Sequence, residues 1–344
     1  GKTTYDYDSA VNVTDAVISK DEGKRAGVPD EATCKEYGLD YNTVLDIYGE
    51  APDANADLSK SFNGKQDEEG RRARMQDTQY TYTLDTSKLS SEIKSGLESG
   101  DYTLVGTYCR GTGQIMSDGP FGGASDAMYS RTYVSNYFTE KGTSALTEYW
   151  NQHILSDSEL VELLKENGSC IFEDSIEAGV KSGGSFWSEQ VKDRFAKEYG
   201  DTYKDMLALL VTVGGSSFTS KDDAVQEQLG DVQTGFQITL GKLYDEQHSA
   251  KISEWAKTFN YKYRAQCYAI TGQDVCGSEM ATDIPEGDNS SKGDGLRKMA
   301  SVVNVEDKES FSMEAVTATG NAKLNWADVV TEVGQNYSDG VSHV

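Results

Sequence analysis

Beyond Pro120, short runs of strand-forming residues alternate with longer segments that have helical periodicity. This alternation predicts parallel β/α units, because two parallel strands are joined by a crossover segment that is usually a helix. We count six units, the last of them cut short where the sequence ends. The strand-like runs are residues 131–138, 170–175, 206–213, 261–268, 311–316 and 340–344, and 206–213 is equally compatible with a buried helix.

Helical segments follow most of these runs. Ser156 and Glu159 have the spacing of a capping box and predict the start of one helix. The segment 224–257 is long enough for a single helix, which we expect to be interrupted near Gly230. The other predicted helices are the one around Leu146–Ile154, Trp187–Tyr199 and Asn325–Tyr337.

The first 120 residues have a different character. Residues 1–65 are polar and acidic, with one short helix predicted at Pro29–Tyr37. The runs Thr78–Leu84 and Tyr102–Tyr108 are rich in strand formers, and Ser87–Leu97 between them is a candidate helix. This part is therefore interpreted as a small β-rich element that precedes the alternating region.

The composition excludes several partners. The chain has 32 Lys and Arg against 57 Asp and Glu, which gives a net charge of −25. Nucleic acids and anionic membranes need clustered positive charge, and no apolar stretch is long enough to insert into a bilayer. The 20 Tyr and 4 Trp suit a groove for a hydroxyl-rich ligand, although an ordinary aromatic core explains them equally well. The five cysteines have no zinc-binding spacing.

Two predicted strands end in an acidic residue after an apolar run. Glu173 follows Cys-Ile-Phe, and Glu314 follows Phe-Ser-Met. Carboxylates at the C-terminal ends of parallel strands face the end of a β/α fold where catalysis takes place. A pair of them is the equipment of glycoside hydrolysis, in which one donates a proton and the other activates water or attacks carbon. The alternative is that each acid pairs with an arginine.

Further polar residues surround these two acids in the sequence. Arg264, Gln266 and Tyr268 alternate along one predicted strand, where they suit either sugar hydroxyls or neutralisation of a core acid. Asp174 and Glu177 lie beside Glu173, and Glu177 shares its side only if the strand continues that far.

The segment 283–288 carries three acids beside a turn and is predicted to be a loop. It suits a hard cation or simple solvation, and its spacing alone favours solvation. His153 and His248 lie among charged helical neighbours and are predicted to be on the surface. No spacing argues for a Ser–His–Asp triad.

Several of these segments together resemble the bacterial α-L-rhamnosidases of glycoside hydrolase family 106. The resembling stretches follow one another in order between residues 110 and 344, and nothing before residue 65 contributes. They are Arg110–Gln114, Gly168–Glu177, Glu254–Ala256 running into Tyr261–Gln266, Asp283–Gly287 and Ser312–Ala315. Cys267 is a departure, since proline is expected at that position in relatives.

The resemblance implies an inverting, Ca²⁺-dependent glycosidase with a (β/α)₈ barrel. Carried over by motif, Glu173 becomes the general acid at the end of strand 4 and Glu314 the general base at the end of strand 7. Asp283 and Glu286 become the candidates for binding Ca²⁺ or sugar hydroxyls. The carboxyl groups of an inverting pair are about 6.5–9.5 Å apart.

The resemblance also implies that the barrel is incomplete in this chain. Residues 1–120 are then a long excursion before the third barrel strand, and residues 121–344 are units 3 to 8 of an extracellular, periplasmic or cell-surface enzyme with further domains. The expected substrate is a plant or pectic glycan with terminal rhamnose, cleaved by the full-length enzyme. Two alternatives stay open, a non-catalytic carbohydrate-binding barrel and a retaining glycosidase, whose carboxyl groups are about 5–5.5 Å apart.

Overall fold

A computed structural model describes residues 4–13, 18–21, 81–84, 86–106, 135–176, 186, 188–203, 207, 217–267, 274–288, 293–315 and 325–344. The chain forms two compact units. The first consists of Gly1–Asn136 and Ala178–Thr239, and the second of Tyr137–Glu177 and Leu240–Val344. The predicted division after residue 120 follows the expected barrel strands and stays a prediction.

The first unit contains three strand pairs among its described residues. Strand β1 pairs with β7 and β2 with β5, both in parallel, while β3 and β4 are antiparallel. The predicted strands at 78–84 and 102–108 and the helix between them are present in their described parts, whereas Pro29–Tyr37 lies outside the described residues. The elements of this unit are β1 (Thr4–Asp6), β2 (Ala10–Val13), β3 (Ile18–Asp21), β4 (Thr81–Leu84), η1 (Thr86–Lys88), α5 (Ser91–Ser99), β5 (Thr103–Gly106), α8 (Glu189–Tyr199), η2 (Asp201–Tyr203), β7 (Ser217–Thr219) and most of α10 (Asp223–Tyr244).

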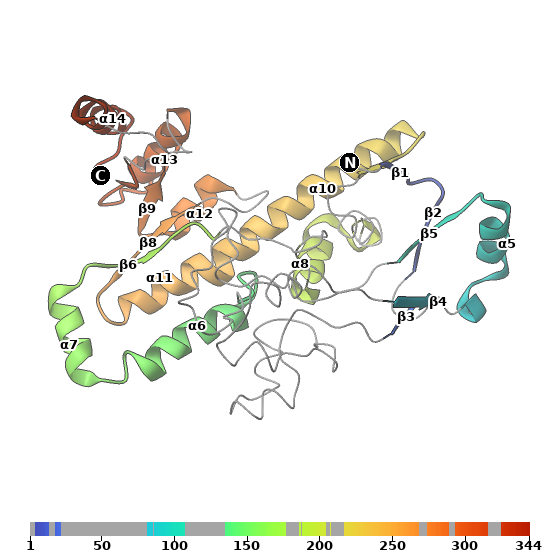
Figure 1. Ribbon diagram of the computed structural model, residues 1–344, viewed down its shortest axis with the longest axis horizontal. Coiled ribbons are helices and arrows are strands. Elements are labelled where there is room, and N and C mark those ends of the chain that lie inside the picture. Colours follow the sequence, from blue (N-terminus) through green and yellow to red (C-terminus); the bar gives the residue numbers. More distant parts are fainter. Residues whose placement is uncertain are drawn as a thin grey trace. The chain divides into compact units, whose positions relative to one another are not determined.

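The second unit is built on a parallel sheet in the order β10-β9-β8-β6 (Figure 1). Each strand therefore lies beside the sheet strand that precedes it in the chain, and each connection contains a helix. The elements are α6 (Glu140–His153), α7 (Ser158–Asn167), β6 (Cys170–Glu173), the π-helical segment η3 (Asp245–Ser249), α11 (Ala250–Lys257), β8 (Lys262–Gln266), α12 (Val275–Ala281), β9 (Ile284–Gly287), α13 (Asp294–Val305), β10 (Ser312–Met313) and α14 (Trp326–Ser338).

The α/β class is thus confirmed, but the described strands do not form a closed barrel. The predicted loop at 283–288 is wrong in one respect, because residues 284–287 form strand β9 between β8 and β10. The described part of the predicted strand 131–138, residues 135–138, is not a strand. At 340–344 there is a single bridge, between His343 and Ser312.

The helices begin at polar caps, with two corrections to the predicted boundaries. Asp157, rather than Ser156, caps α7, since its carboxylate accepts from the backbone of Glu159 and Leu160. Helix α10 runs through Gly230 without a break, and the irregularity comes at η3, where the chain passes through a π-helical turn. Such turns insert an extra residue and are frequent at functional sites.

The two faces of the sheet are different. Tyr263 and Ala265 of β8 pack with Ile252 of α11, and Met313 of β10 joins a core with residues of α13. Because side chains alternate along a strand, Arg264 and Gln266 point to the other face. We call the face of the sheet that carries Tyr263 and Ala265 the helix-facing side, and the face that carries Arg264 and Gln266 the inner side.

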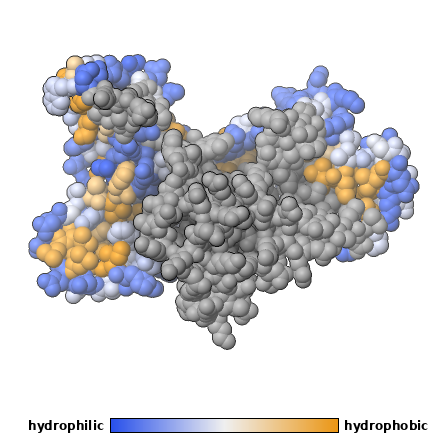
Figure 2. Space-filling model, viewed as in Figure 1, coloured by the Kyte–Doolittle hydropathy of each residue, from blue (hydrophilic) through white to orange (hydrophobic). Residues whose placement is uncertain are grey.

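Apolar side chains also remain on the surface of the second unit. Figure 2 shows orange patches in the area where Figure 1 places α7, and Leu163 of that helix is 52% exposed. Tyr149 of α6 is 60% exposed. None of the helices in the described ranges is long and apolar enough to cross a membrane.

Helix α12 carries a completely buried acid, Glu279. Among the residues that the structure describes, neither of its carboxyl oxygens has a hydrogen-bond partner. Burial raises the pKa of Glu279 to about 8. The positive charge of Lys308 lowers this pKa somewhat, and the negative charge of Asp274 raises it further. Glu279 is therefore mainly protonated at neutral pH. Burial also raises the pKa of the nearby Asp245 to about 7, although Ser278 donates a hydrogen bond to it.

We expect Glu279 to make the second unit less stable as the pH rises. The folded chain keeps a proton that the unfolded chain releases, so the free energy of unfolding falls by up to about 1.4 kcal/mol per pH unit between the usual glutamate range and the raised pKa. Glu279→Gln should reduce this loss, measured as the difference in melting temperature between pH 5.5 and pH 8. Glu306→Gln, at an exposed position, is the control; an unchanged pH response in Glu279→Gln would contradict the expectation.

Candidate functional site

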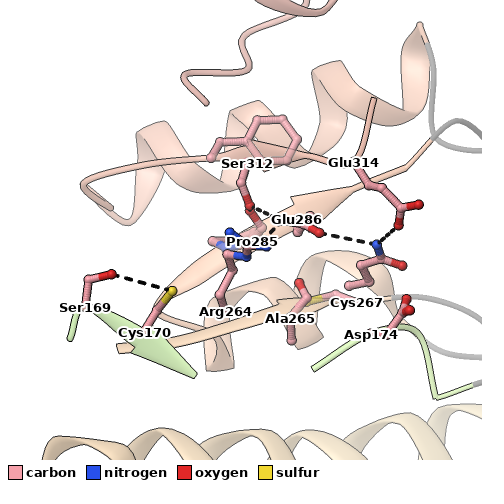
Figure 3. Close-up of polar contacts among 12 residues, drawn as sticks. Ser169, Cys170, Asp174, Arg264, Ala265, Cys267, Pro285, Glu286, Ser312 and Glu314 are labelled. Carbon is pink, nitrogen blue, oxygen red and sulfur yellow. Dashed lines mark hydrogen bonds and ion pairs between the residues drawn. The ribbon is translucent and has the colours of Figure 1, made fainter. Parts of the chain in front are cut away.

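A polar network occupies the inner side of the sheet at the C-terminal ends of its strands. It consists of Arg264, Gln266, Glu286, Ser312 and Glu314, and we call it the Gln266 network (Figure 3). Strand register places Gln266, Glu286 and Ser312 side by side on β8, β9 and β10. Glu314 follows β10 directly, and its backbone N–H donates to the carbonyl of Gly287 at 2.9 Å.

Glu286 is the buried centre of this network. Its side chain is only 4% exposed, and Oε2 lies 2.9 Å from Nε of Arg264. Ser312 donates to the same oxygen at 2.7 Å, and Nε2 of Gln266 donates to Oε1 at 3.3 Å. Both carboxylate oxygens are therefore engaged, and the positive charge of Arg264 compensates the buried negative charge.

Glu314 is, in contrast, exposed. Nε2 of Gln266 donates to its Oε2 at 2.6 Å, which fixes one of the two carboxylate oxygens. Gln266 and Glu314 come from strands separated by β9, and neighbouring strands are about 4.8 Å apart. Their contact means that the side chains of β8 and β10 lean toward each other over Glu286.

Arg264 also contacts Phe172 of β6. Its guanidinium carbon lies 4.4 Å from the centre of the Phe172 ring, in the range of a cation–π interaction. Phe172 is 43% exposed and Arg264 33%, so this part of the inner side is partly open among the described residues. Arg264 thus links the aromatic surface of β6 to the buried acid of β9.

Removing the arginine should leave Glu286 as a buried, uncompensated charge. We expect Arg264→Met to reduce the free energy of unfolding by about 3 kcal/mol, and the double variant Arg264→Met/Glu286→Gln to recover part of it. Urea denaturation measures both. Lys165→Met, which removes an exposed pair with Glu162, should cost less than about 1 kcal/mol. Equal effects of Arg264→Met and Lys165→Met would contradict the assignment.

A second polar network lies on the helix-facing side, around Glu173. Nε2 of His248 is 2.9 Å from both carboxylate oxygens of Glu173, and the hydroxyl of Tyr263 donates to Oε2. Nδ1 of His248 is 3.2 Å from Oγ1 of Thr143. His248 is completely buried, while the side chain of Glu173 is 25% exposed.

The charge state of this network follows from its contacts. Burial pushes the pKa of Glu173 upward, but attraction to His248 and hydrogen bonds from His248 and Tyr263 outweigh it, so the pKa lies below its usual range. Burial and the negative charge of Glu173 raise the pKa of Tyr263. Tyr263 therefore keeps its proton and donates a hydrogen bond to the carboxylate of Glu173.

The segment η3 is what turns His248 toward Glu173. The ring of Tyr244 stacks on the imidazole with centroids 5.3 Å apart, and that of Tyr137 meets it edge-on at 5.1 Å. The predicted surface position of His248 is wrong, because a charged sequence neighbourhood does not reveal the π-helical turn. The exposed position of His153 is confirmed.

The structure does not bring Glu173 and Glu314 onto the same face. Register pairs Glu173 with Ala265, which faces the helices, whereas Glu314 belongs to the inner side. Asp174 follows the end of β6, and Figure 3 shows its exposed carboxylate turned toward the side on which Glu314 lies. Strand β6 ends at Glu173, so alternation no longer places Glu177. Glu177 and Tyr268 lie outside the described residues.

Asp283 and Glu286 do not share a site. Asp283 accepts from Ser253 at 2.7 Å and from the backbone of Tyr263 at 2.9 Å, and its other oxygen is 3.0 Å from the ammonium of Lys257. These contacts do not fit Asp283 and Glu286 as joint ligands of one Ca²⁺ ion. In the described part of the chain, no group of three or more His, Cys, Asp or Glu side chains is arranged to hold a metal.

Four residues of these networks, Tyr263, Ser312, His248 and Thr143, are absent from the sequence-based candidates. Tyr263 alternates with Arg264 and Gln266, so the same periodicity that selected those residues places it on the opposite side. Ser312 stands two residues before Glu314 and therefore shares its face. His248 has no comparable signal in the sequence.

The fold of this chain is similar to that of a solved enzyme structure. A solved structure of a rhamnosidase from Novosphingobium sp. PP1Y is similar with a TM-score of 0.49 and 18% sequence identity. The similarity covers 64% of this chain and 21% of the rhamnosidase chain. No protein-family model matches the sequence. No curated protein matches it either.

Proposed function

We propose that this chain carries part of the catalytic domain of a glycoside hydrolase that removes terminal α-L-rhamnose from glycans. The observation that carries the proposal is Glu314, an exposed carboxylate at the C-terminal end of a parallel sheet, fixed through one oxygen by Gln266. Asp174 lies at the same end of the sheet (Figure 3). Rhamnose as the substrate rests on the family resemblance of the sequence motifs.

The strand order supports a barrel as the complete fold. Strands β6, β8, β9 and β10 follow one another in space as they do in the chain, and the sheet does not reverse its direction of growth. A doubly wound sheet needs such a reversal, whereas a (β/α)₈ barrel does not. The leaning of Gln266 and Glu314 across β9 suits a concave inner side.

In the proposed reaction, Glu314 is the general base. Its free oxygen accepts a proton from a water molecule, which attacks the anomeric carbon from the side opposite the leaving group. The buried Glu286 stays paired with Arg264 and holds Gln266, which in turn orients Glu314. Ser312 donates a second hydrogen bond to Glu286 and so helps to hold this arrangement.

The proton donor comes, in this proposal, from the residues that directly follow β6. The resemblance assigns the role to Glu173, but that carboxylate faces the helices and is bonded to His248 and Tyr263. Asp174 is on the side of Glu314, and Glu177 is three residues farther along the chain. Whether Asp174 or Glu177 is the proton donor, Glu314 remains the general base. Both cases keep the inverting mechanism, in which the acid and the base act on opposite sides of the sugar.

Replacing the proposed base should abolish turnover. We expect Glu314→Gln to lower kcat for an aryl α-L-rhamnoside by about 10²–10⁴-fold in the full-length enzyme, since a positioned general base contributes about that much. Glu254→Gln, on an exposed face of α11, is the control. Unchanged turnover in Glu314→Gln contradicts the proposal. Rhamnoside binding without any turnover in the unaltered protein indicates a carbohydrate-binding barrel, and retention of the anomeric configuration indicates retaining chemistry.

A Ca²⁺ requirement is tested separately. The resemblance leads us to expect that EDTA lowers activity and that added Ca²⁺ restores it. Because Asp283 is bonded to Ser253, Tyr263 and Lys257, Asp283→Asn should leave the concentration of Ca²⁺ needed for half-maximal recovery unchanged within about twofold. A tenfold increase would show that Asp283 does bind the ion. The extracytoplasmic location and the further domains remain part of the proposal.

A further inference from the structure

The network around His248 is an unusual use of buried polar groups. It combines an imidazole, a carboxylate, a threonine hydroxyl and the hydroxyl of Tyr263 on the helix-facing side, where apolar packing is the rule. Burying a carboxylate costs several kcal/mol before its partners compensate, and an apolar cluster of the same volume is often as stable. Stability alone therefore gives no reason for these residues.

The contacts of Glu173 leave its carboxylate no freedom of rotation. His248 lies 2.9 Å from both oxygens, and Tyr263 donates to one of them from the neighbouring strand. His248 is held on its other side by Thr143 of α6 and between the rings of Tyr137 and Tyr244. Elements α6, η3, β6 and β8 are thereby joined at one point.

The contact between Glu173 and His248 lies next to the proposed catalytic site. Glu173 is the last residue of β6, and the next residue is Asp174. A strand that has just ended has lost its ladder bonds, so the direction of the following residue depends on what holds the last one. The exposed Asp174 accepts a hydrogen bond from the backbone N–H of Ser175 at 2.7 Å.

We infer that Glu173 and His248 form a buried positioning pair that fixes the end of β6 and so directs Asp174 and the residues after it toward Glu314. This inference rests on the proposed function for its effect on catalysis. Neither residue touches substrate. Glu173 acts through the backbone of Asp174, and His248 acts through Glu173. The resemblance, by comparison, makes Glu173 the proton donor itself.

The test compares variants that keep or remove the bonds. Gln in place of His248 retains an N–H donor, whereas Ala removes it. We expect His248→Ala to lower kcat by about 10–100-fold with KM within about twofold, as misplacement of a catalytic group by about 1 Å does. His248→Gln should recover most of that loss. His153→Ala, at an exposed histidine of α6, is the control. Full activity in a folded His248→Ala protein overturns the inference.

The conservative variant separates positioning from proton donation. Glu173→Gln keeps an acceptor for His248 and Tyr263 but has no acidic proton, so with a poor leaving group we expect kcat to fall at least about tenfold less than in Glu173→Ala. A proton donor would lose its function in both variants alike. Equal losses in Glu173→Gln and Glu173→Ala therefore overturn the inference and restore Glu173 as the acid.

Hydrogen exchange keeps the inference testable if the protein has no hydrolase activity. His248→Ala should speed exchange of the backbone amides of residues 174–176 more than His153→Ala does, while exchange in β9 stays unchanged. Equal exchange in the two variants contradicts the positioning pair whatever the activity. Absence of turnover in the unaltered enzyme counts against the proposed function alone.

Discussion

The alternation of side chains along β8 is the constraint on which the polar chemistry of the second unit depends. Tyr263 and Ala265 face the helices, and Arg264 and Gln266 face the inner side. One strand of five residues therefore supplies partners to two separate carboxylates, Glu173 on one side and Glu286 on the other. The sheet acts as a partition between them, and each carboxylate has its own compensating charge.

Three buried or partly buried carboxyl groups in this unit are stabilised in three different ways. Glu173 is ionised beside an imidazole, Glu286 is paired with a guanidinium, and Glu279 has neither and keeps its proton. The desolvation cost is the same in kind for all of them. The three carboxyl groups differ in whether a neighbouring helix or strand supplies a side chain that donates a hydrogen bond or a positive charge to them. Near the C-terminal ends of β6 and β10, the exposed carboxylates of Asp174 and Glu314 are open to interaction with something outside the chain.

The sequence allowed the parallel β/α arrangement and the positions of β6 and β8 to be predicted, because their apolar runs are long enough to show a period. Strand β9 was missed, since its four residues include a proline and a glycine, which are uncommon inside strands. The inner direction of Gln266 and Arg264 followed from alternation alone. The face to which Glu173 points could not be predicted in this way. It depends on which residue of β8 lies beside Glu173, and that register is determined by tertiary structure.

The errors at His248 and near Gly230 both follow from not locating the irregularity of the segment 224–257 at Asp245–Ser249. Periodicity analysis assumes that a helix advances by a constant angle, about 100° per residue. The π-helical turn at Asp245–Ser249 breaks that assumption and resets the phase of everything after it. Glycine at position 230 is tolerated within α10, so the residue type that usually marks a helix break was not the one that mattered.

The same turn has a consequence for how this chain can vary. A single extra residue lets α10 and α11 present unrelated faces, so each helix can change its packing surface without forcing changes on the other. Loss of one residue there would turn the segment into continuous α-helix and rotate the whole of α11 relative to α10 by roughly 100°. Insertions and deletions elsewhere in exposed loops are mild by comparison. The packing of α11 therefore depends more on the number of residues in this turn than on the identity of most residues around it.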